Sequence, residues 1–155
     1  MGAENIEEFN LALEGEAPLR PWLQEQAKML ADIQAADVVA ALGGLVAEID
    51  KVALTGEFAE FVASTFRRAV STGIAGWHDD DLAFTRDWGF DLAGIERPVA
   101  VWQGGQDRMV PFAHGQWLAE HIPNARACLY RDEGHLSLVV RALDRIIDDL
   151  VAIAG

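Results

Sequence analysis

Apolar residues in the first half of the chain recur at the three-and-four spacing of amphipathic helices. Ile6, Phe9 and Leu13 mark the first segment, and residues 19–33 and 38–49 continue the pattern. Glycine and proline residues separate these segments: Gly15, Pro18, Pro21 and Gly43-Gly44. We find no alternating pattern typical of a strand in this half, so we expect a run of helices.

A further helix is expected from Thr55 to about Gly73. Thr55 is a good helix N-cap residue, and Glu57 would lie in the first turn, where negative charge is favourable. One face of this helix should be buried, because its apolar residues recur at helical spacing: Phe58, Phe61, Val62 and Phe66.

Residues 73–94 have aromatic side chains but little periodicity. Trp77, Trp88 and the acidic run Asp79-Asp80-Asp81 fall in this segment. We expect a packed connector without a long element. The three aspartates lack the alternating spacing and the glycine of a calcium loop, so we interpret them as a solvated acidic turn or a helix N-cap cluster.

The second half changes character, because two short apolar runs alternate with helical patterns. Residues 98–103 form an apolar run closed by glycine, which suits a strand buried on both faces, and residues 125–130 predict a second strand. A helix from Pro111 to about His121 should separate them, and the tail after Gly134 has helical spacing. This order predicts two parallel strands with a right-handed crossover.

Two polar residues follow these strands at the same edge of the expected sheet. Asp107 comes just after the first strand and His135 just after the second. A carboxylate that accepts from one imidazole nitrogen leaves the other nitrogen to take a proton from a nucleophile, as the acid and base of a Ser-His-Asp triad do. Asp107 and His135 are therefore the candidate catalytic residues, and the order of acid before histidine fits.

The segment from Pro98 to Ser137 resembles the C-terminal end of an α/β-hydrolase. The resemblance rests on these residues: Gly104 to Pro111 (Gly-Gly-Gln-Asp-Arg-Met-Val-Pro), His114-Gly115, Trp117-Leu118-Ala119, Ile122-Pro123 and Gly134-His135. The upstream helices, with Gly76-Trp77, the acidic run and Trp88-Gly89-Phe90, look like the cap and return segment of hydrolases similar to proline iminopeptidases and esterases. The resemblance implies an α/β fold with a helical cap at residues 1–75, a connector at 76–97 and the core segment at 98–155. It also implies that Asp107 is the family acid and His135 the family base.

The nucleophile elbow of that family, Gly-x-Ser-x-Gly, and its upstream His-Gly oxyanion segment are not found in these 155 residues. We therefore expect the second half of such an enzyme, as a truncated gene product, an internal-start product or a deliberate fragment, that cannot assemble a full triad. Ser71 is expected to close a helix, Cys128 to lie within a strand, and Ser137 to cap the last helix. None of them replaces the missing serine convincingly.

The composition of the chain limits the classes of partner and the cellular compartment that we expect. The chain has 25 acidic and 12 basic residues, a net charge of -13, which disfavours nucleic acid. Its single cysteine cannot form an internal disulfide, and no apolar run is long enough to cross a membrane, so we expect a cytoplasmic protein that binds no membrane. We expect no metal site, since His114 and His121 would lie about 10.5 Å apart along a helix. We also expect no cofactor, because Gly104-Gly105 is followed by an acid and not by a helix N-terminus with lysine.

Three functional hypotheses remain open. The first is a hydrolase remnant for ester, peptide or related acyl bonds of a small-molecule substrate, inactive alone, whose substrate-binding residues we do not assign. The second is a non-catalytic interaction domain, and the third an independent enzyme using Ser71 or Cys128. A two-stranded sheet with an open apolar edge is marginal alone, so we expect self-association or pairing with a missing N-terminal half.

Overall fold

The computed structural model describes residues 1–154, which form two compact units. The helical unit comprises Gly2–Leu45 and Leu54–Trp88. The sheet unit comprises Met1, Val46–Ala53 and the chain from Gly89 onward. Each unit is therefore built from separate stretches of sequence.

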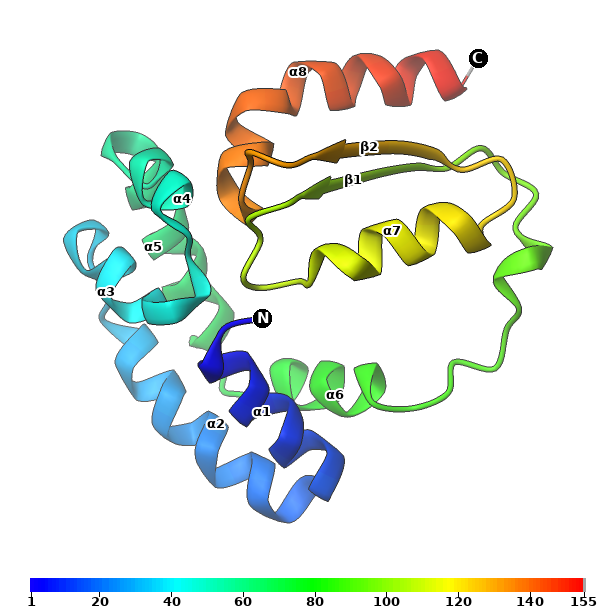
Figure 1. Ribbon diagram of the computed structural model, residues 1–155. Helices are drawn as coiled ribbons and strands as arrows, with labels where there is room; N and C mark the ends of the chain where they lie inside the picture. Colours follow the sequence, from blue (N-terminus) through cyan, green and yellow to red (C-terminus); the bar gives the residue numbers. More distant parts are fainter. Residues whose placement is uncertain (155) are drawn as a thin grey trace. The chain divides into compact units, whose positions relative to one another are not determined.

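The helical unit begins with two helices that lie side by side, α1 (Ala3–Glu14) and α2 (Glu16–Ala31) (Figure 1). Gly15 joins them in one residue with φ of 114°, a conformation that glycine adopts without steric cost. Ala12, Leu19 and Leu23 form the buried core between them. Pro18 and Pro21, expected to separate helices, both lie inside α2 near its start.

The segment at 38–49 is broken up rather than forming one helix. It contains α3 (Val38–Leu42), the 3₁₀ turn η2 (Gly43–Leu45) and the start of α4 (Glu48–Ala53), and another 3₁₀ turn, η1 (Ala35–Asp37), precedes it. Gly43 has φ of 51°, and this left-handed residue ends α3. The break matters because α4 belongs to the sheet unit.

The helix expected after Thr55 is confirmed as α5 (Gly56–Val70). It ends three residues before Gly73, whose φ of 99° suits a residue beyond a helix end.

The expectation that residues 73–94 contain no long element is wrong, because α6 (Ala75–Phe84) is a regular helix of ten residues. The pattern was hidden because the inward side of α6 carries polar residues, His78 at 3% and Asp81 at 4% exposure. Trp77 of the same helix packs edge-to-face on Trp22 at 6.5 Å. Asp81 is therefore buried, and the acidic run is not a solvated turn.

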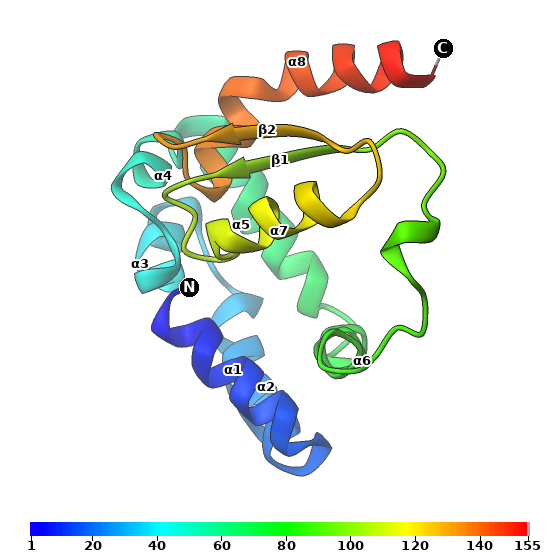
Figure 2. The ribbon, with the colours of Figure 1, turned by 45° about the vertical axis from the view of Figure 1, so that its right-hand side comes forward.

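The sheet unit contains a parallel pair of strands, β1 (Ala100–Gly104) and β2 (Arg126–Tyr130), with Trp102 opposite Cys128. The helix α7 (Phe112–His121) connects them and packs on both. The last helix, α8 (His135–Ala154), lies on the opposite face of the pair, as both views show (Figures 1 and 2). The predicted strand, helix, strand and helix are confirmed, and the chain has a mixed α/β fold.

The strand β1 is not buried on both faces as expected. Ala100, Val101 and Trp102 are half-buried, and only Gln103 and Gly104 at its carboxyl end are buried. The apolar stripe of α8 is similarly open along much of its length, since six of its residues are exposed: Val139, Val140, Leu143, Ile147, Leu150 and Val151. We call these six residues the α8 apolar face.

The division into units cuts the chain differently from the expected cap, connector and core. Residues 46–53 pack with the sheet, although the sequence places them in the middle of the cap. Residues 76–88, assigned to the connector, pack with the helices, and the remaining link to β1 carries only the 3₁₀ turn η3 (Leu92–Gly94). Among residues 1–154, no helix is both long and apolar enough to span a bilayer.

Candidate functional site

The loop after β1 lies tightly against the loop after β2, and this contact depends on two glycines. A Cβ on Gly104 would lie 2.4 Å from the backbone oxygens of Glu133 and Gly134, and one on Gly105 would lie 2.7 Å from the backbone of Arg131. The backbone N–H groups of Gly105 and Gln106 donate across this contact to Tyr130 at 2.7 Å and to Glu133 at 2.8 Å. The Gly-Gly pair thus brings the two loops together.

The carboxylate of Asp107 accepts four hydrogen bonds. The N–H groups of Met109 and Val110 each donate to Oδ1 at 2.8 Å, and Gln103 Nε2 donates to Oδ2 at 2.8 Å. His135 supplies the fourth contact through its ring. The Asp107 side chain is only 4% exposed, so the carboxylate has one fixed orientation.

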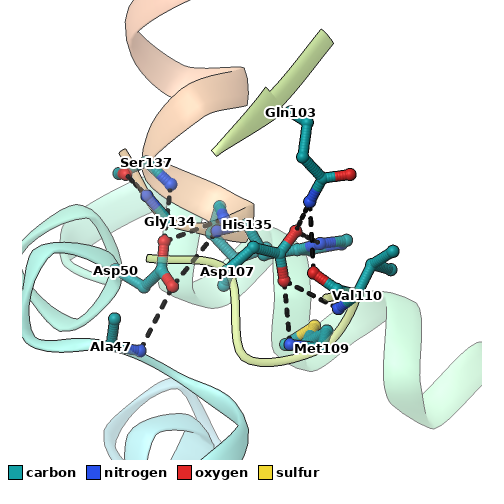
Figure 3. A network of polar contacts seen from close by, with 10 residues as sticks. Ala47, Asp50, Gln103, Asp107, Met109, Val110, Gly134, His135 and Ser137 are labelled. Carbon is teal, nitrogen blue, oxygen red and sulfur yellow. Dashed lines mark hydrogen bonds and ion pairs between the residues drawn. The ribbon is translucent and has the colours of Figure 1, made fainter. Parts of the chain in front are cut away.

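His135 is the first residue of α8, and its Nδ1 lies 2.8 Å from Asp107 Oδ2 (Figure 3). With Asp107 ionised, this contact places the ring proton on Nδ1 and leaves Nε2 as the basic nitrogen. The His135 side chain is 38% exposed, so the ring remains accessible from solvent. The structure therefore brings together the two residues that the sequence predicted, which are 28 positions apart.

The two groups shift each other's protonation. Burial raises the pKa of Asp107, but the hydrogen bond from His135, the backbone donors and the His135 charge together outweigh burial and lower that pKa below its usual 3.8. The hydrogen bond to Asp107 raises the pKa of His135 above its usual 6.5, against the opposing effect of burial, and the charges of Asp107 and Asp50 add to the rise. The arrangement therefore favours a charged pair.

Sequence reasoning missed Asp50, which lies in α4 and is fully buried. Its carboxylate accepts from the backbone N–H groups of Leu136 and Ser137 at 2.9 Å, at the start of α8 (Figure 3). The contacts span more than 80 residues of sequence, so no local pattern announces them. The sequence around it gives no signal either, because Glu48 and Lys51 lie in the same stretch and Asp50 does not stand out from them.

A polar cavity of about 340 Å³ lies beside Asp107 in the sheet unit. Its walls come from α4 and its preceding turn and from the loop after β1: Ala47, Glu48, Gly105, Gln106, Asp107 and Arg108. In residues 1–154, no group of three or more histidine, cysteine or acidic side chains is placed to hold a metal ion. Besides Asp107, the charged side chains in the cavity wall are the carboxylate of Glu48 and the guanidinium of Arg108.

The other candidate nucleophiles lie in different surroundings. Ser71 is exposed at the end of α5, and its hydroxyl donates to the carbonyl of Arg68 at 2.7 Å. Cys128 is half-buried within β2. Ser137 is fully buried in the first turn of α8, where its Oγ accepts from the Gly134 N–H and donates to Glu133. These positions agree with structural roles.

His114 and His121 both lie on α7, and His121 stacks on Trp117 with its ring centroid 4.0 Å away. The Nδ1 of His121 also contacts the Trp117 carbonyl at 2.7 Å. His121 is thus engaged by its own helix.

Comparison with known proteins gives one distant match. Over 73 residues, 46% of this chain, the sequence is 32% identical to the pimeloyl-[acyl-carrier protein] methyl ester esterase of Aromatoleum aromaticum. The match is to a hydrolase. It covers 29% of that esterase, so this chain spans less than a third of the length of its relative. No protein-family model matches the chain, and no solved structure matches it significantly.

Proposed function

We propose that this chain carries the acid and base of an α/β-hydrolase that cleaves ester, peptide or related acyl bonds. Asp107 is the acid and His135 the base in this proposal. The observation that carries it is the 2.8 Å contact between the two side chains at the carboxyl ends of neighbouring parallel strands. The partial match to a methyl ester esterase supports the same reaction class.

The geometry explains how each residue would act. Asp107 holds the imidazole through Nδ1, so Nε2 can accept the proton of an attacking hydroxyl and later return it to the leaving group. The lowered pKa of Asp107, which the hydrogen bond from His135 maintains against burial, keeps the carboxylate negative beside the imidazolium. The reaction also needs a nucleophile, and we propose that it lies outside these 155 residues, so that the chain alone is inactive.

The test is a mixing experiment with p-nitrophenyl esters. The chain is assayed alone and after addition of the separately produced segment of the Aromatoleum esterase that precedes the matched residues. We expect release of p-nitrophenol above background only in the mixture, and we expect His135→Ala to abolish it. A fluorophosphonate probe should label the added segment and leave this chain unlabelled.

His114→Ala is the matched control, because His114 is an exposed histidine of the same unit outside the Asp107 contacts. It should leave the mixed activity unchanged. Activity of the chain alone that survives His135→Ala, or fluorophosphonate labelling at Ser71, would contradict the proposal. Stable association of the two segments without turnover would favour the second hypothesis, an interaction domain with an unused Asp-His pair.

A specific observation favours an interaction role in addition. The α8 apolar face exposes six aliphatic side chains along one helix, each more than 40% accessible. Exposed apolar surface of this kind marks an association site. We propose that a second copy of the chain covers this face when no other segment is present, and a segment that supplies the rest of a hydrolase core is the alternative occupant.

A further inference from the structure

Asp50 holds the first turn of the helix that begins with the candidate base. Its Oδ1 accepts from the N–H groups of Leu136 and Ser137 at 2.9 Å. Its Oδ2 accepts from the N–H of His135 at 3.3 Å and from that of Ala47 in its own segment at 3.2 Å. One carboxylate therefore fixes three consecutive amides of α8, including that of the base itself (Figure 3).

The carboxylate of Asp50 is surrounded by backbone N–H donors. The side chain is fully buried, and none of the ion pairs formed within residues 1–154 involves it. A buried carboxylate without a cation needs several N–H donors, and the positive end of a helix dipole supplies both donors and favourable potential. Gly134 leaves the necessary space, because a Cβ there would lie 2.3 Å from either oxygen of Asp50.

We propose that Asp50 is a positioning residue for His135 and that its negative charge stabilises the protonated imidazole. The inference rests on the proposed function, in which His135 becomes positively charged as it takes the proton of the nucleophile. Asp107 would then hold the ring from Nδ1, while Asp50 holds the backbone beneath it and adds a second negative charge. The base would thus depend on a residue 85 positions earlier in the chain.

Two acids in the segments around the start of α8 are already paired with cations. Glu133 accepts from Ser137 Oγ at 2.7 Å and pairs with Arg141 at 3.2 Å. In α4, Glu48 pairs with Lys51 at 2.6 Å, and Arg108 lies close enough to affect Glu48. The charges of Asp107 and Asp50 are the ones that act on His135, in addition to the hydrogen bond and burial described above.

Asp50→Asn removes the charge and keeps one oxygen to accept from the amides of Leu136 and Ser137, although its amide nitrogen cannot accept from His135 and Ala47 as Oδ2 does. The readout is the pH titration of the His135 ring, followed by NMR in the purified chain. We expect the pKa of His135 to fall by about half a pH unit or more. Asp132→Asn is the matched control, because Asp132 is an exposed acid in the loop before α8. An unchanged His135 titration in Asp50→Asn would overturn the proposal.

A second measurement does not depend on whether Asp50→Asn folds. In the wild-type chain, the ¹³Cγ resonance of Asp50 should show an inflection at the pKa of His135, and this inflection should vanish in His135→Gln. Its absence from the wild type would also overturn the proposal. Both readouts are independent of turnover, so failure of the hydrolase proposal is seen in the mixing experiment and failure of this one in the titrations. In an active mixture, Asp50→Asn should lower kcat about tenfold, with KM unchanged, because the charge acts on the protonated imidazole and not on substrate binding.

Discussion

Trp77 donates its indole N–H to the carboxylate of Glu8 at 2.7 Å, joining α6 to α1 within the helical unit. Asp81, one turn further along α6, is buried beside the same glutamate, and its Oδ2 has no hydrogen-bond partner. The carboxyl groups of Glu8 and Asp81 thus lie next to each other where little water reaches them. Burial raises the pKa of Glu8, although Trp77 and Asp81 oppose the rise through hydrogen bonds.

Asp81→Asn should stabilise the chain at alkaline pH. Burial, the charge of Glu8 and its hydrogen bond, and the charge of Asp80 raise the pKa of Asp81 from 3.8 to about 7. The folded state therefore binds more protons than the unfolded state between about pH 4 and 7, and wild-type stability falls as pH rises through that window. At pH 8 we expect the variant to unfold at a higher urea concentration, with a free energy of unfolding larger by about 1 kcal/mol or more. Asp80→Asn, at an exposed neighbour, should change stability by less than about 0.5 kcal/mol.

Gly134→Ala should destabilise the sheet unit, because the new Cβ would lie 2.3 Å from the Asp50 carboxylate. Either the carboxylate moves away from the amides of α8 or the loop shifts, at a cost of about 2–3 kcal/mol. Gly94→Ala is the matched control, since an added Cβ there meets nothing within 4 Å. Urea unfolding followed by circular dichroism measures both variants, and equal midpoints would disprove the close contact.

Asp107→Asn should remove a pH-dependent contribution to stability. The lowered pKa of Asp107 contributes stability above about pH 4 that is lost as pH falls through the folded value, since the hydrogen bonds from His135 and the backbone and the His135 charge together outweigh burial. The raised pKa of His135, due mainly to its hydrogen bond with Asp107, contributes stability below pH 6.5 that is lost as pH rises through the folded value. The free energy of unfolding of the wild type should therefore exceed that of the variant most between about pH 4 and 6.5, by about 1–2 kcal/mol. A difference that is constant from pH 4 to 9 would contradict this assignment.

Substitution of the α8 apolar face should shift the association state. Leu150 and Val151 are 65% and 67% exposed, so replacing both with glutamate removes apolar surface at little cost to folding. In sedimentation velocity we expect oligomers for the wild type and a monomer for the double variant. Leu13→Glu is the control, because Leu13 is 69% exposed on α1 of the helical unit. A monomeric wild type would disprove self-association.

The sequence predicted the chain from β1 to α8 well, because its signals there are local. Short apolar runs mark both strands, the first closed by Gly104-Gly105, and Pro111 marks the helix between them. Asp107 and His135 could be paired from sequence because parallel strands end at one edge of a sheet. Their 2.8 Å contact follows from that topology.

Two other features could not be predicted, for different physical reasons. The helix α6 buries His78 and Asp81, so hydropathy does not follow helical spacing there. Asp50 acts on α8 through a contact that only tertiary folding creates. The sequence shows Gly134 as a break between β2 and α8. It does not show that a glycine is needed there because the Asp50 carboxylate occupies the space of a Cβ.

The order of the units along the chain constrains how the protein can be divided. The chain leaves the helical unit at Leu45, supplies eight residues to the sheet unit, and returns at Leu54. A gene cut at Gly89 would encode both strands and both flanking helices but would leave the amides at the start of α8 without Asp50. During synthesis, α4 leaves the ribosome well before α8, so Asp50 can hold the His135 amide in place only after most of the chain has been made.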